Sequence, residues 1–174
     1  MTTLNDRAAF LTEHYVYEIN MLRWTHATLA GTEEGFLANS LIESFCVHAR
    51  ALMDFYNSNP RADDIVATHF IRSGQFSANA ISLIPTDIRT RVNKQIAHLT
   101  AARENPSKKV DDADRQTLLT AIETDHTAFK QAVDSQYANC FSREQTFVAT
   151  VLAVGQSPAS ATNQIQGFSW SSVP

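Results

Sequence analysis

The chain has 174 residues, of which 44% are hydrophobic and 18% are charged, and its formal net charge is −4. This length fits a single domain, and five glycines and five prolines are few for the frequent turns of an all-β protein. The acidic balance argues against a generally basic nucleic-acid-binding surface, and no apolar run approaches the roughly 20 residues that span a bilayer.

The two cysteines predict reduced thiols. Cys46 and Cys140 lack CxxC spacing, and the N-terminus lacks the basic, apolar and small-residue order of a signal peptide. Both features are typical of a cytoplasmic protein, which is the location that we expect.

Apolar residues at three- and four-residue steps predict a first helix over residues 4–29. One apolar stripe contains Leu4, Ala8, Leu11, Tyr15, Ile19, Leu22 and Leu29. A second stripe contains Phe10, Tyr17, Met21 and Trp24. We expect the helix to bury both stripes and to end at Gly31.

The second helix is expected to begin after Thr32, which would cap it, and to continue to Asn59-Pro60. Residues 57–84 then read as an irregular connection that carries at most one short helix, near residues 64–71.

A third helix is predicted to open at Pro85-Thr86-Asp87 and to end before Pro106. A fourth helix is predicted over residues 113–137, because three aspartates precede a regular apolar pattern. After Glu144 the chain contains no Asp, Glu, Lys or Arg, which predicts an irregular C-terminal tail.

Four amphipathic helices need one another to bury their apolar faces, so we expect an all-α fold, a four-to-five-helix bundle. The expected domain organisation is a helical bundle over residues 1–141 and a partly mobile C-terminal extension over residues 142–174.

Positive charge is concentrated in one stretch. Residues 86–109 hold six Lys or Arg against two Asp or Glu, a net charge of +4, which leaves −8 for the rest of the chain. A local positive potential can attract a polyanion, although solvated charges on a helix surface would give the same composition.

Arg91 and His98 are the main candidate site residues. They lie seven positions apart, so a helix would present both side chains on one face, with Lys94 and Gln95 beside them. This face borders the apolar side, where a cleft or a subunit interface would be lined. A permanently charged arginine beside a histidine that titrates near neutral pH suits phosphate chemistry.

The second helix carries a polar stripe, formed by Asn39, Glu43, Arg50, Asp54 and Asn57. A solvated face with a four-residue Arg50–Asp54 pair explains the stripe equally well. If the third helix packs beside the second, Glu43 and Arg50 would join Arg91 and His98 in one polar cleft. His48 falls on the opposite, apolar side and is expected to be a hydrogen-bonded core residue.

We expect no metal and no cofactor. Glu123 and His126 form one Glu-x-x-His pair, but a di-iron centre of the ferritin-like type needs a second pair and two further glutamates.

Several segments resemble a family of uncharacterised bacterial helical proteins over about residues 35–103. They are Glu43-Ser44-Phe45, His48-Ala49-Arg50-Ala51-Leu52, Asp54-Phe55, Asp63-Asp64, Asn93-Lys94 and Ala97-His98-Leu99-Thr100. That resemblance implies no activity.

Arg91 and His98 with six intervening residues are also similar to the Arg-x(4 to 6)-His motif of the HEPN superfamily. These are helical-bundle proteins that include metal-independent RNases of toxin and antiviral systems, and two protomers usually bring their motifs together in a cleft. The resemblance implies proton transfer by His98 at the RNA 2′-hydroxyl or the leaving oxygen. It also implies that Arg91 stabilises charge in the transition state.

Two functional hypotheses follow. The first is a HEPN-like homodimer that cleaves RNA without metal, in stress or phage defence. The alternative is a non-catalytic helical protein whose polar stripes form a dimer or partner interface. Neither needs a membrane, and the sequence contains no DNA-specific motif.

Overall fold

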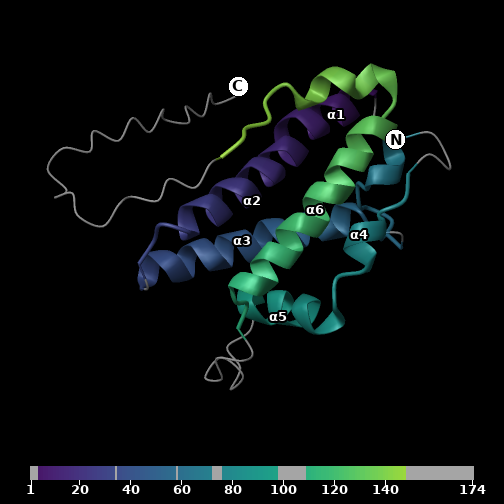
Figure 1. Ribbon diagram of the computed structural model, residues 1–174. Coiled ribbons are helices and arrows are strands. Elements are labelled where there is room, and N and C mark those ends of the chain that lie inside the picture. Colours follow the sequence, from purple (N-terminus) through teal and green to yellow (C-terminus); the bar gives the residue numbers. More distant parts are fainter. Residues whose placement is uncertain (1–3, 34, 58, 72–75, 98–108, 148–174) are drawn as a thin grey trace, which may run out of the picture.

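The computed structural model describes residues 4–33, 35–57, 59–71, 76–97 and 109–147, and this part of the chain is all-α (Figure 1). Its α-helices are α1 (Leu4–Ala9), α2 (Val16–Leu29), α3 (Phe36–Phe55), α4 (Asn79–Ser82), α5 (Thr86–Ala97) and α6 (Asp112–Ala132). A π-helical segment (Phe10–Tyr15) joins α1 to α2, and 3₁₀ segments occupy Ala67–His69 and Ser135–Phe141. The predicted all-α bundle is confirmed.

The predicted first helix is continuous through the π-helical segment, where the backbone N–H of Val16 bonds the carbonyl of Leu11, five residues earlier. The first apolar stripe is buried as expected from Leu11 to Leu22. Burial of the whole second stripe was the wrong expectation, because Tyr17 and Trp24 remain 37% and 40% exposed.

Helix α3 begins later than the sequence predicts. Thr32 does not cap it: the Thr32 hydroxyl donates to the carbonyl of Thr28 at 2.8 Å and so closes the end of α2. Gly35 instead precedes α3 with a φ of 143°, a conformation that glycine adopts without a steric penalty.

The 57–84 connection contains two short helical pieces, the 3₁₀ turn Ala67–His69 and α4, where the sequence predicts at most one. Helix α6 ends at Ala132, before the predicted residue 137. Val133 is extended because it pairs with Ile71, and the next N–H, that of Asp134, donates to the carbonyl of Phe70 at 3.0 Å. A tertiary backbone pairing therefore terminates this helix.

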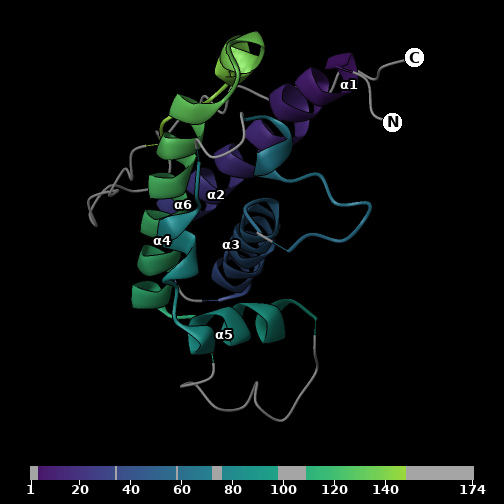
Figure 2. The same cartoon turned by 90° about the vertical axis from the view of Figure 1, so that its right-hand side faces the viewer.

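Helices α2 and α3 form the main hairpin, α6 packs against both, and α5 lies across α3 at one end of the bundle (Figures 1 and 2). Phe129 of α6 is fully buried at the centre. It contacts the rings of Tyr15, Phe55, Tyr56, Phe70, Phe76 and Phe141. Burial of one phenylalanine stabilises a fold by roughly 1.5–3 kcal/mol, so this aromatic cluster is a major source of stability.

Candidate functional site

Arg91 is held by two carboxylates. Its guanidinium donates to both oxygens of Asp114, from Nε at 2.7 Å and from Nη2 at 2.6 Å, and its Nη1 donates to Asp87 at 2.9 Å. The Asp114 side chain is 7% exposed and that of Arg91 is 21% exposed. The bidentate bond to Asp114 is the main reason that the pKa of Arg91 is raised above its usual value. The guanidinium therefore stays charged, and the two carboxylates balance its charge within the fold.

Asp114 also belongs to the N-terminal cap of α6. The backbone N–H of Asp114 donates to the Asp111 side chain at 2.8 Å, and the N–H of Asp111 approaches the Asp114 carboxylate at 3.4 Å. This reciprocal arrangement is a capping box. Arg91 thus ties α5 to the beginning of α6.

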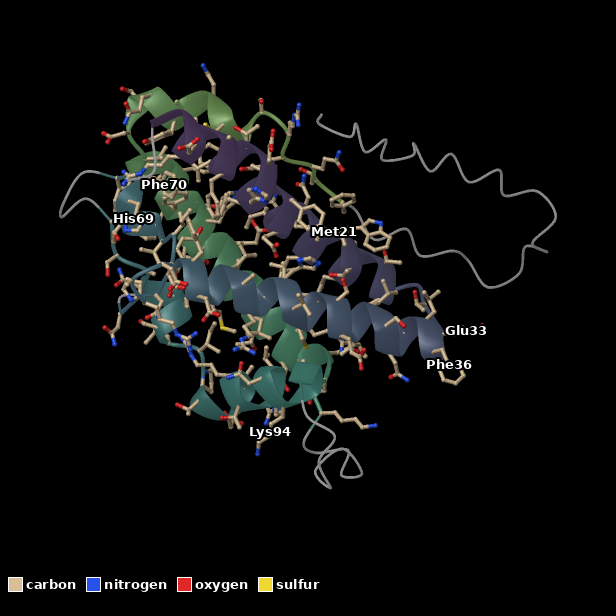
Figure 3. The ribbon with its side chains drawn as sticks, turned by 180° about the vertical axis from the view of Figure 1, so that it is seen from behind. Met21, Glu33, Phe36, His69, Phe70 and Lys94 are labelled. Carbon is tan, nitrogen blue, oxygen red and sulfur yellow. The ribbon has the colours of Figure 1, made fainter. Side chains whose placement is uncertain are left out.

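The second predicted residue, His98, lies outside the described residues. Lys94 is exposed on α5, and its side chain points away from the bundle (Figure 3). Gln95 belongs to α5, but its side chain lies outside the described part of the structure.

Glu43 and Arg50 are exposed on α3. Arg50 lies 3.8 Å from Asp54 in the predicted four-residue pair, and these side chains are 47% and 68% exposed. Arg50 and Arg91 are thus engaged by different carboxylates. The expected polar cleft also requires His98, so it stays a prediction.

The structure contains a buried polar network whose members no sequence pattern groups together. The hydroxyl of Tyr15 lies 2.5 Å from that of Tyr56 and 2.6 Å from Nδ1 of His126. On its other side, Nε2 of His126 lies 3.1 Å from Glu144 Oε1, an ion-pair distance without hydrogen-bond alignment. Burial is the main reason that the pKa values of Tyr15 and Tyr56 are raised, so both tyrosines stay protonated at neutral pH.

Glu144 connects this network to the surface. Its other oxygen lies 2.9 Å from Nζ of Lys130 and 3.7 Å from Arg23. Burial acts to raise the pKa of Glu144, but His126 and Lys130 outweigh it and lower the pKa to about 2. Arg23 also forms a bidentate pair with Glu123, at 2.5 and 2.7 Å. Glu123 is therefore engaged in an ion pair between α2 and α6.

His126 has a solvent exposure of 2%, so a ligand in solution does not reach it. The network therefore positions helices. The available signal was the place of His126 within the apolar face of the fourth helix, which marks a buried histidine that needs polar partners. The sequence spacing does not identify those partners, because Tyr15 and Glu144 come from distant segments.

The expected packing of His48 is confirmed: it is buried, and its Nδ1 lies 2.7 Å from Glu18. Both cysteines are free and buried. Burial raises the pKa of the Cys46 thiol to about 12, so this residue is not a nucleophile at neutral pH.

Within the described residues, no group of three or more His, Cys, Asp or Glu side chains is arranged to hold a metal ion. The described helices also include none that is long and apolar enough to cross a membrane. Comparisons with protein-family models, curated proteins and solved structures found no match for this chain.

Proposed function

We propose that this protein is a helical interaction module that forms a homodimer through the exposed face of α3. The observation that supports this proposal is the composition of that face. Phe36 and Val47 are 94% and 44% exposed, and they share one line of the helix with the exposed residues Glu43, Arg50 and Asp54. Phe36 projects from the N-terminal end of α3 (Figure 3).

The charges on this face support the proposal. Glu43 and Arg50 lie on either side of Val47. In an antiparallel pair of α3 helices with a two-fold axis near Val47, Glu43 of each protomer faces Arg50 of the other. A two-fold interface repeats each contact, so this geometry gives two ion pairs around an apolar centre.

Helix α2 extends the apolar part of the surface. Tyr17 and Trp24 are exposed, and the ring of Tyr17 lies 5.6 Å from that of His48 on α3. Large exposed aromatic side chains are enriched at protein interfaces. A dimer centred on α3 would cover Tyr17 together with Val47.

Charge reversal tests this dimer by sedimentation velocity at micromolar concentrations. Glu43→Arg places like charges opposite Arg50, and Arg50→Glu does the same opposite Glu43. We expect each single variant to be monomeric and the double variant to be dimeric again. Arg61→Gln, a change at an exposed arginine outside α3, is the matched control. A monomeric wild-type protein, or a double variant without recovery, would contradict the proposal.

A second candidate function is metal-independent RNA cleavage at Arg91 and His98. The observation that favours it is that Arg91, within the positively charged 86–109 stretch, has a side chain that is 21% exposed and held in one orientation by Asp114. An arginine that carboxylates orient can still offer part of its guanidinium edge to a phosphate. Release of Asp87, which is 67% exposed, would free one donor.

The test is cleavage of single-stranded RNA in the presence of EDTA. We expect His98→Ala to reduce the cleavage rate by about 10²-fold or more, because a general acid or base contributes a factor of this size. Circular dichroism melting serves as the folding control. Equal cleavage by the wild-type protein and the variant would indicate a contaminating nuclease and remove this function.

A further inference from the structure

A cleft of about 460 Å³ lies between the C-terminal end of α3, the residues that precede α4, α4 itself and the beginning of α5. Figure 2 shows α4 beside α6, with α3 and α5 nearby. Tyr56, Phe76, Met53 and Ile81 provide an aromatic and apolar part of the wall. The rings of Tyr56 and Phe76 are 5.8 Å apart. This volume falls in the range of small-molecule sites.

Arg89 supplies a cation to this cleft. Its Nε donates to the carbonyl of Ile84 at 3.3 Å, and its Nη2 donates to the carbonyl of Ile81. No carboxylate of the described residues forms an ion pair with Arg89. The neighbouring Arg91, in contrast, is paired with two. Backbone carbonyls therefore orient the guanidinium of Arg89, and no carboxylate among the described residues acts as its counter-ion.

Asn79 supplies a neutral donor to the same cleft. The hydroxyl of Ser77 donates to Oδ1 of Asn79 at 3.0 Å, which places the amide nitrogen on the other side. This Nδ2 has no hydrogen-bond partner among the described residues. The carboxylate that lines the cleft, Asp54, is 68% exposed and lies next to Arg50. The cleft therefore combines two donor residues, one of them a cation, with an aromatic wall.

We propose that this cleft binds a small organic anion. An aromatic or apolar body packs against Tyr56 and Phe76, while a carboxylate or phosphate accepts hydrogen bonds from Arg89 and Asn79. This inference does not depend on the dimer or on RNA cleavage, because neither of the proposed anion donors, Arg89 and Asn79, belongs to α3 or to the Arg91 site.

The alternative role of Arg89 is structural, since it bonds the carbonyl of Ile81 within α4 and that of Ile84 just beyond its end. A guanidinium has five N–H donors, however, and the two carbonyl bonds leave others for a ligand. Helix α4 also has a second anchor: the buried Asp125 accepts from the N–H groups of Ala80 at 3.1 Å and Ile81 at 2.7 Å. We therefore expect α4 to stay in place when Arg89 is changed.

Isothermal titration calorimetry with four probes tests the site. Phenyl phosphate and benzoate carry both an anion and a ring, inorganic phosphate carries only the anion, and benzyl alcohol carries only the ring. We expect saturable binding of at least one of the first two, about tenfold tighter than either half-probe. The comparison of phenyl phosphate with benzoate shows whether the site prefers a phosphate or a carboxylate.

Two variants test the assigned donors. We expect Arg89→Gln and Asn79→Asp each to weaken binding of the preferred probe by about tenfold or more, the latter because it places a negative charge where a donor stood. Arg61→Gln, at an exposed arginine outside the cleft, is expected to bind normally. Unchanged thermal melting shows that Asn79→Asp, at an exposed position, remains folded.

Absence of saturable binding by the wild-type protein would overturn the proposal. If both variants bind the probe as tightly as the wild-type protein does, the proposal is also overturned, since the ligand would then bind elsewhere. Inorganic phosphate that binds as tightly as phenyl phosphate would contradict the role assigned to Tyr56 and Phe76.

Discussion

Glu144 is a carboxylate whose pKa depends on side chains from two helices. Lys130 and His126 of α6 lie 2.9 and 3.1 Å from its oxygens, and Arg23 of α2 lies at 3.7 Å. The Glu144 side chain is 14% exposed, so water screens these charges only in part. The lowered pKa of about 2 therefore corresponds to a contribution to the stability of the fold.

The pH dependence of unfolding checks this contribution. The pKa of Glu144 is about 2 when folded and near 4.5 when unfolded, so the stabilisation is complete above pH 4.5 and is lost as the pH falls towards 2. It corresponds to about 3 kcal/mol. We expect Glu144→Gln to lower the free energy of unfolding in urea by an amount of this order at pH 7. The difference from wild type should shrink steadily between pH 4.5 and 2.

Glu13→Gln is the control for this experiment, because Glu13 is an exposed carboxylate on the π-helical segment. A difference between wild type and Glu144→Gln that stays constant from pH 7 to pH 2 would show that Glu144 acts through packing.

At the scale of the element, the first turn of α6 shows how a helix end becomes a joint between helices. Three aspartates at residues 111–114 match the preference of helix N-termini for acidic side chains, which is why the sequence predicts this start. The spacing does not indicate that Asp114 turns inward to Arg91. That contact depends on where α5 packs, which is set by residues far along the chain.

The two carboxylates on Arg91 differ in burial and so provide a matched pair of variants. Asp114→Ala leaves a partly buried guanidinium without its bidentate partner and breaks the capping box, so we expect a loss of about 3 kcal/mol in the free energy of unfolding. Asp87→Ala removes an exposed four-residue pair and is expected to cost less than about 0.5 kcal/mol. Urea denaturation at pH 7 measures both.

Equal losses in the two variants would contradict the role of Asp114 as a joint between α5 and α6. Asp111→Ala separates the cap from the ion pair, because it removes only the capping side chain, with an expected cost of about 1 kcal/mol.

The helix limits show which local signals are reliable. The starts of α5 and α6 follow from a proline or from acidic residues beside an apolar pattern, and both agree with the structure. The predicted cap at Thr32 was wrong because its hydroxyl bonds within α2, and Gly35 marks the entry to α3. The end of α6 was missed because the pairing of Val133 with Ile71 is a tertiary contact.

At the scale of the whole molecule, residues 143–145 are part of the packed structure. The side chain of Asn20 donates to the carbonyl of Arg143 at 3.0 Å and accepts from the N–H of Gln145 at 2.8 Å. Arg23 donates to the carbonyl of Gln145 at 3.2 Å. The chain therefore follows α2 beyond residue 141, where the sequence places the end of the helical bundle.

The proposed dimer and the proposed anion site depend on different parts of the molecule. The dimer uses a surface that the bundle leaves uncovered, and the cleft is formed where α3, α4 and α5 meet. Charge reversal on α3 therefore leaves the residues that supply the proposed anion contacts unchanged. Measurement of oligomeric state and of ligand binding on the same variants separates the two proposals.

The sequence by itself determined the fold class, the main helices and the main buried stripe of the first helix, because these depend on the 3.6-residue repeat and on local capping residues. It also placed His48 on the buried side of its helix. Only the tertiary structure decided which charges from distant segments meet. Arg91 with Asp114, and Glu144 with His126 and Lys130, join segments through packing. A pairing of this kind depends on distances between elements, which no local pattern encodes.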